Sequence, residues 1–122
     1  MKKLLYFLPA LVLLIAAKNT KPDYSKLLPG VVKITDDLYY DKTEITNISW
    51  LEYIHWHRKN DSNNVAEAFP DTNVWASSLT YNQPYVSYYL NHPAYRDYPV
   101  VGVSWQQAND YCQWRTDRVK EY

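Results

Sequence analysis

The chain has 122 residues, with 13 basic and 13 acidic side chains, and hydrophobic residues make up 47% of it. This length accommodates one domain of ordinary size. The 13 tyrosines and 5 tryptophans are too much aromatic surface to leave in water, which excludes a wholly disordered chain. The zero net charge argues against nucleic acid as a partner, because phosphate binding needs a basic excess. The single cysteine excludes an internal disulfide and a cysteine-rich metal cluster.

The N-terminal residues have the pattern of a secretory signal peptide. Two lysines follow Met1, and residues 4–17 form an apolar run that only Pro9 interrupts. We expect a signal peptide at 1–17, then a polar linker at 18–30, and a secreted, periplasmic or other cell-envelope location. An uncleaved membrane anchor is the alternative, although a spanning helix needs about 20 apolar residues. We expect membrane association only through such an uncleaved segment.

Two short β-branched stretches follow the linker. Residues 31–34 and 38–45 read as strands, and the Thr-Asp-Asp sequence at 35–37 is typical of a turn. Side chains alternate imperfectly between polar and apolar along the second stretch. The sequence therefore predicts a β-hairpin.

A helix is predicted over residues 48–59. Thr46 and Asn47 precede it with side-chain oxygens that cap helices, and Ser49 with Glu52 has the spacing of a capping box. One face collects four residues at spacings of three and four, namely Trp50, Tyr53, Ile54 and His57.

Residues 60–98 are predicted to be mostly irregular, with one helical turn near Ala66. Three prolines interrupt this stretch, and the tyrosines between 81 and 98 show no period. A buried tyrosine can satisfy loop backbone through its hydroxyl, so we expect an ordered, packed loop. A ligand surface at 81–98 is the alternative. Residues 99–103 read as a buried strand.

A second helix is predicted from Trp105 to the end of the sequence. Ser104 and Gln107 have the spacing of a capping box. The helical period groups Trp105, Ala108, Cys112, Arg115 and Val119 on one face, and the rings of Trp105, Tyr111 and Trp114 are expected to supply core area. Because no terminator follows, we expect the chain to stop within a domain. Cys112 is expected to be a small core residue, not a nucleophile.

Two stretches of the sequence carry a family resemblance. Residues 41–47 contain Glu44, Thr46 and Asn47, and residues 98–115 contain Gly102, Ser104, Trp105, Cys112, Trp114 and Arg115. Both resemble signatures of the formylglycine-generating enzyme family, the sulfatase-modifying-factor domain. Residues 92–98 and 114–118 look most like members from gliding-motility and type IX secretion proteins. The resemblance implies an α+β, C-type-lectin-like fold with short strands, two helices and long ordered loops, of which residues 31–122 would be the N-terminal half.

The resemblance also bears on function. Catalytic members of the family oxidise a substrate cysteine with a copper-binding pair of cysteines in the C-terminal half. Cys112 resembles a different, helical position, so no catalytic residue, calcium site, copper site or other cofactor carries over, and the signature residues are expected to be scaffold. Glu44 and Asn47 are suited to fixing a strand-to-helix corner through backbone hydrogen bonds. We expect a non-catalytic envelope protein for binding or assembly, whose partner is another protein or the missing C-terminal half. The alternative is a fragment of a copper-dependent oxidase.

The remaining candidate site residues have weak patterns. His55 and His57 point about 200° apart on a helix, so they do not converge on a metal. We expect packing or surface roles for both. Asp36, Asp37 and Asp110 lack a histidine or serine at an informative spacing, and we expect them to be solvated charges.

Overall fold

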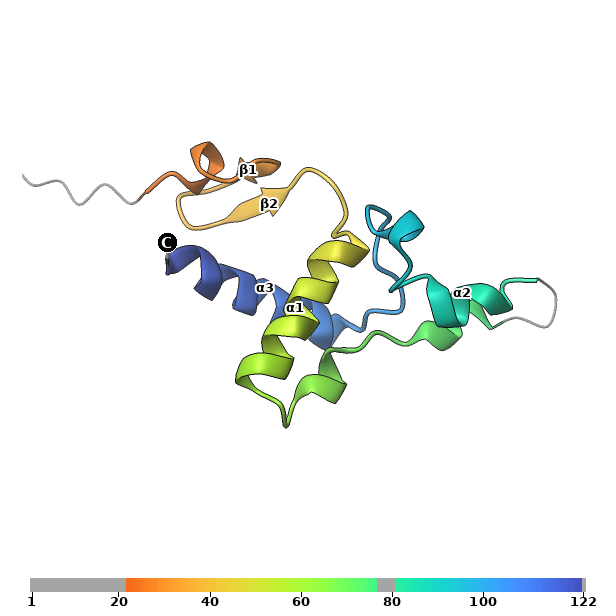
Figure 1. Cartoon of the computed structure of the whole chain (residues 1–122). Helices are drawn as coiled ribbons and strands as arrows, with labels where there is room; N and C mark the ends of the chain where they lie inside the picture. Colours follow the sequence, from red (N-terminus) through yellow and green to blue (C-terminus); the bar gives the residue numbers. More distant parts are fainter. Residues whose placement is uncertain (1–21, 77–80, 122) are drawn as a thin grey trace, which may run out of the picture. The chain divides into compact units, whose positions relative to one another are not determined.

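The computed structural model describes residues 22–76 and 81–121 and divides the chain into two compact units, Met1–Lys42 and Thr43–Tyr122. A hairpin and several helices make the chain α+β (Figure 1). The expected signal peptide at 1–17 and the first residues of the expected linker lie outside the described residues. Within the described segments, no helix is both long and apolar enough to span a membrane.

The first unit contains the predicted hairpin. Strand β1 (Val31–Lys33) pairs antiparallel with β2 (Tyr39–Asp41), and Val32 lies opposite Tyr40. A short 3-10 helix at Tyr24–Lys26 precedes it, and the Tyr24 ring contacts the Tyr39 ring at 5.5 Å between centroids. The hairpin prediction is confirmed, although β2 is shorter than the run 38–45.

The second unit contains three α-helices. These are α1 (Asn47–Asn60), α2 (Gln83–Tyr88) and α3 (Trp105–Lys120), with 3-10 helices at Val65–Ala68, Thr72–Trp75 and Pro93–Tyr95. The helix predicted at 48–59 is confirmed. Its N-cap is Thr46, whose side chain accepts a hydrogen bond from the Ser49 backbone N–H at 3.4 Å. The expected Ser49–Glu52 capping box is wrong, because Ser49 already lies inside the first turn.

The stretch 60–98 is more helical than predicted. The turn near Ala66 is confirmed as the 3-10 helix Val65–Ala68, but α2 and two further 3-10 helices were not predicted. Pro84 suggested a loop, yet it lies in the first turn of α2, where proline is favoured. The expectation of two helices is therefore corrected to three.

The strand predicted at 99–103 is wrong. Pro99 forms an isolated bridge with Thr46, and the Val100 N–H donates to the Ile45 carbonyl at 2.9 Å. The chain then turns at Gly102, which has a φ of 76°. A β-branched run makes a strand only where a partner strand continues beside it, and here α1 begins at once after Thr46.

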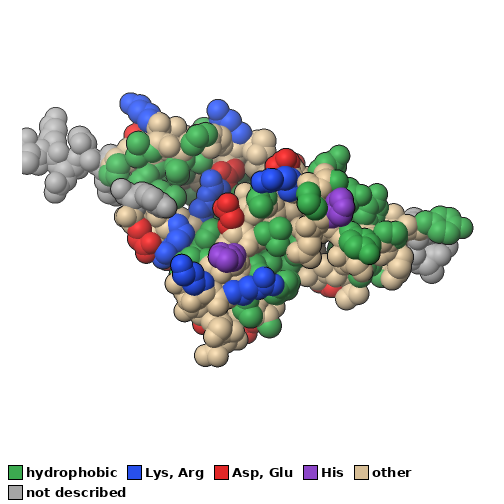
Figure 2. Space-filling model, viewed as in Figure 1, with side chains coloured by type: hydrophobic (Ala, Val, Ile, Leu, Met, Phe, Trp, Pro, Cys, Tyr) green, Lys and Arg blue, Asp and Glu red, His purple; other side chains and the backbone are tan. Residues whose placement is uncertain are grey.

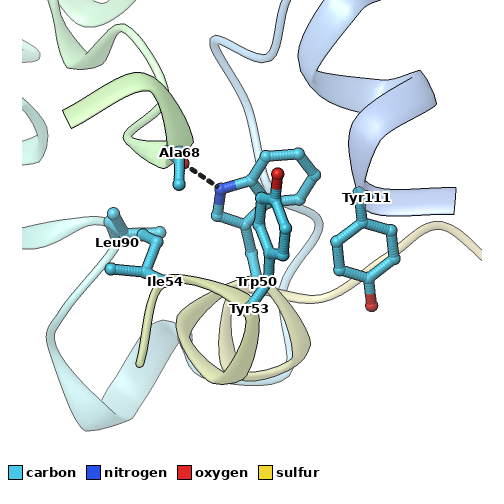
Figure 3. Close-up of a cluster of buried hydrophobic side chains, with 6 residues drawn as sticks. All are labelled: Trp50, Tyr53, Ile54, Ala68, Leu90 and Tyr111. Carbon is cyan, nitrogen blue, oxygen red and sulfur yellow. Dashed lines mark hydrogen bonds between the residues drawn. The ribbon is translucent and has the colours of Figure 1, made fainter. Parts of the chain in front are cut away.

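The core of the second unit lies between α1, α3 and the segments that join them. Its buried members are Trp50, Tyr53, Ile54, Ala68, Leu90 and Tyr111 (Figure 3). The Trp50 Nε1–H donates to the Ala68 carbonyl at 2.9 Å, and the indole stacks on Tyr111 at 5.0 Å between centroids. The face predicted for α1 is confirmed by the burial of Trp50, Tyr53 and Ile54.

The packing face predicted for α3 is wrong. Trp105 is 78% exposed, and Ala108 and Cys112 are also exposed. The helix packs through Tyr111, which is 4% exposed, and Trp114, which confirms two of the three rings expected to supply core area. Burying these two large rings removes far more apolar area from water than burying Ala108 and Cys112 would. Cys112 is therefore a surface residue, and Trp105 contributes little to the core.

Candidate functional site

The first signature forms a buried junction at the start of α1. Asn47 is fully buried, and its Nδ2 donates to the Tyr89 carbonyl at 3.1 Å and the Tyr95 carbonyl at 2.9 Å. Its backbone N–H donates to the Tyr98 carbonyl at 2.8 Å. One side chain thus joins the N-terminus of α1 to the segment that follows α2.

Glu44, expected at the same corner, does not contribute to it. The side chain is exposed and makes no hydrogen bond within the described segments. The backbone of Ile45 and the cap at Thr46 already supply the local bonds at this corner. The expected role of Glu44 in backbone bonding is therefore wrong.

Aromatic rings surround the Asn47 junction. Tyr89 stacks on Tyr95 at 5.4 Å between centroids and contacts Trp75 at 4.9 Å, and its hydroxyl donates to the Pro99 carbonyl at 2.8 Å. Burial raises the pKa of Tyr89 and of Tyr95. Figure 2 shows hydrophobic side chains gathered over α2 and its neighbours. The segment 81–98 therefore packs on itself, as expected. Three of its tyrosine rings are nevertheless exposed, those of Tyr81, Tyr88 and Tyr98.

The second signature contains a glycine, Gly102, that no other residue can replace without displacing the neighbouring backbone. Gly102 has a φ of 76°, and a Cβ built on it would lie 2.0 Å from the Asp71 carbonyl oxygen. The Asp71 backbone N–H donates to the Gly102 carbonyl at 2.8 Å. The close approach of two backbones therefore requires glycine here.

Ser104 and Gln107 anchor the start of α3. The Ser104 side chain accepts from the Gln107 N–H, and the Ser104 N–H donates to the Gln107 Oε1 at 2.9 Å, which completes the predicted capping box. The Gln107 Nε2 also donates to the carbonyls of Glu67 and Phe69, both at 2.8 Å. The sequence indicated the cap but not this second use of the glutamine.

The rest of the second signature lies along α3. Trp114 is half-buried and contacts Tyr53 at 5.2 Å and Tyr111 at 5.4 Å between ring centroids. Arg115 is also half-buried. Arg118 was not among the candidate site residues, yet its guanidinium lies over the Trp56 ring at 4.9 Å. Trp56 belongs to α1, so no local spacing indicated this contact.

The chain's thiol lies at the surface of α3. Cys112 is exposed, and with one cysteine in the sequence no pair of thiolates can form within the chain. His55 is exposed, whereas His57 packs against Tyr53 and Trp56. Across residues 22–76 and 81–121, no three His, Cys, Asp or Glu side chains are close enough to share a metal. These residues do not fit a copper site of two thiolates.

The carboxylates singled out from the sequence have local partners. Asp36, whose side chain is 89% exposed, pairs with the Lys33 ammonium at 2.9 Å, and this contact raises the pKa of Lys33. Asp110 accepts from the Gln106 Nε2 at 2.9 Å. These are surface contacts between neighbours, and they bring no catalytic residues together.

Comparison with known proteins gives the family. The model of the sulfatase-modifying factor enzyme 1-like domain, FGE-sulfatase, matches residues 17–120. The chain therefore belongs to the sulfatase-modifying factor family. No curated protein and no solved structure gives a significant match.

Proposed function

We propose that this chain is a non-catalytic member of its family, which acts in the cell envelope as a binding or assembly component of the kind found in gliding motility and type IX secretion. The observation that carries the proposal is how the signature residues are used. Asn47, Gly102 and Ser104 hold segments of backbone together. Their polar groups therefore serve the scaffold and are not directed at a substrate.

The lone thiol supports the same proposal. Cys112 lies exposed on α3, and its neighbours supply no second soft ligand. An oxidase of this family would need another polypeptide to bring two cysteines together. The competing proposal is that the chain is a fragment of a copper-dependent oxidase. Replacing Cys112 would lower the activity of such an oxidase only if this thiol took part in the reaction.

A genetic test in the source cells asks whether function needs the thiol of Cys112 or only the folded scaffold. In cells that lack the protein, Cys112→Ser is expected to restore the envelope function as well as wild type does. Asn47→Ala, which removes the junction at α1, is expected to fail. Loss of function in Cys112→Ser, with normal protein abundance, would contradict the non-catalytic proposal.

A second measurement tests binding directly. The tagged full chain is isolated from the envelope in mild detergent, and its native mass is determined. We expect a discrete complex of constant stoichiometry, unchanged in Cys112→Ser. Recovery of wild type as a free monomer would contradict an assembly role.

A further inference from the structure

A cluster of aromatic and basic side chains lies where the C-terminal half of α1 meets α3. We call it the seam cluster, and its members are Tyr53, Trp56, His57, Trp114 and Arg118. The Tyr53 ring contacts His57 at 4.6 Å and Trp114 at 5.2 Å, while Trp56 lies between His57 and the Arg118 guanidinium, at 5.1 Å and 4.9 Å.

Three polar atoms of the seam cluster are buried without a hydrogen-bond partner in the described part of the chain. They are His57 Nδ1, Trp114 Nε1 and Arg118 Nε. The indole and guanidinium nitrogens can only donate. Asp61 Oδ2 lies 3.7 Å from His57 Nδ1, which is too far for a hydrogen bond. Because buried donors are nearly always satisfied in native proteins, these atoms call for an acceptor that the described residues do not supply.

The Arg118 side chain offers the place where such an acceptor can enter. Its Nη2 donates to Glu121 Oε1 at 2.7 Å, while the adjacent Nε has no partner among the described residues. The side chains of Arg118 and Glu121 are 32% and 60% exposed, so their ion pair lies at the surface, although Nε itself is covered. Glu121 can therefore swing away at little cost, since exposed ion pairs are weak. The freed Nε and Nη2 edge matches both oxygens of a carboxylate.

The surroundings favour a negatively charged partner. Both helices carry basic residues in their last turns, Arg58 and Lys59 on α1 and Lys120 beside Arg118 on α3. On the face in Figure 2, Lys and Arg side chains gather over α1 and the C-terminal half of α3. Trp114 precedes Arg118 by four residues, so one helical turn separates the two donors on the same face.

We propose that the seam cluster docks an acidic side chain of a partner polypeptide. The carboxylate replaces Glu121 on the Nε and Nη2 edge of Arg118, and Trp114 Nε1 donates to the same acidic segment. An acidic residue on a protein surface suits an ion pair that lies at the surface, whereas small free acids are held in pockets that bury most of the ligand. This inference rests on the proposed binding function and names its partner's chemistry.

The test uses the full chain with 15N-labelled tryptophan indoles and a capped peptide, acetyl-Ala-Glu-Ala-amide. We expect saturable movement of the Trp114 indole N–H signal, assigned with Trp114→Phe, and no movement with the matching Gln peptide. Arg118→Gln and Arg118→Lys are each expected to weaken binding at least tenfold, because lysine keeps the charge but not the fork. Arg96→Gln removes an exposed charge near the N-terminus of α1, outside the seam cluster, and should bind as wild type does.

Each other result overturns the proposal. Equal response to the Glu and Gln peptides, or an unchanged affinity in a folded Arg118→Lys variant, excludes recognition of a carboxylate by the guanidinium. Acetate that binds as tightly as the Glu peptide shows a site for free acids and excludes a polypeptide partner. If the Glu peptide does not bind, the native complex expected under the proposed function can still be present. Failure of this inference is therefore distinguishable from failure of the proposed function.

Discussion

Asn47 shows how a single polar side chain can hold distant segments together. Its amide donates to the carbonyls of Tyr89 and Tyr95, and the Tyr95 carbonyl also accepts from the Tyr98 N–H at 3.0 Å. We predict that Asn47→Ala lowers the free energy of unfolding by about 3 kcal/mol, since it removes two hydrogen bonds and leaves the Tyr89 carbonyl unpaired. Denaturant titration followed by circular dichroism measures the loss. Asn109→Ala, which removes an exposed amide bonded to the Trp105 carbonyl, should change it by less than about 0.5 kcal/mol.

The two glycines make a matched pair of tests. Both have positive φ, but Gly30 has nothing within 4 Å of a built Cβ, whereas at Gly102 the Asp71 carbonyl oxygen lies at 2.0 Å. Gly30→Ala should lower the free energy of unfolding by about 1 kcal/mol, because alanine is strained in the left-handed backbone conformation. Gly102→Ala should cost at least twice as much, because the two backbones must also separate. Equal losses in denaturant titrations would show that the close approach at Asp71 is not maintained.

The sequence located these residues but not their partners. Thr46, Asn47, Gly102 and Ser104 belong to recognisable signatures, and local cap geometry follows from short spacings. Asn47 reaches carbonyls more than 40 residues away, and nothing in a local pattern specifies such a pairing. Arg118 was missed for the same reason, because its partner Trp56 lies on another helix.

At the scale of elements, α3 shows which of two helical faces is buried. Both faces of α3 follow the same helical period, so the period alone does not show which face is buried. The large rings of Tyr111 and Trp114 determine that their face is the buried one. Strand 99–103 was predicted from β-branched composition, which does not reveal whether a neighbouring strand exists. The helix α2 was hidden by its proline and tyrosines, since it is short and has no apolar period.

The observed face of α3 gives a sharp comparison. Tyr111→Ala removes a ring that stacks on Trp50 and should cost about 3 to 5 kcal/mol, as for other buried aromatic residues. Trp105→Ala, on the exposed face, should cost less than about 1 kcal/mol. Thermal unfolding of the two variants measures the difference. A larger loss in Trp105→Ala would restore the face that the sequence predicted.

At the scale of the whole molecule, buried tyrosines make stability sensitive to alkaline pH. Burial, followed by the charges of Asp110 and Glu67, raises the pKa of Tyr53 above its ordinary value of 10.0. A raised pKa in the folded state stabilises the fold fully below pH 10, and this stability is lost as the pH rises through the folded value. Burial acts in the same direction on Tyr89 and Tyr95.

We therefore predict cooperative unfolding at alkaline pH, coincident with tyrosinate absorbance. Tyr53→Phe removes one ionisable hydroxyl from the core and should shift the midpoint upward. Tyr88→Phe, at an exposed ring, should leave the midpoint in place. An unfolding midpoint unaffected by Tyr53→Phe would show that this hydroxyl does not titrate with unfolding.

The scaffold interpretation and an oxidase differ most clearly in their consumption of dioxygen. Purified full chain is mixed with a copper salt, a cysteine-containing peptide and dissolved oxygen, and uptake is recorded beside a protein-free control and the Cys112→Ser variant. We predict that wild type and variant both match the protein-free rate and that the peptide cysteine is not converted to an aldehyde. Protein-dependent oxygen uptake with formation of the aldehyde would contradict the scaffold interpretation.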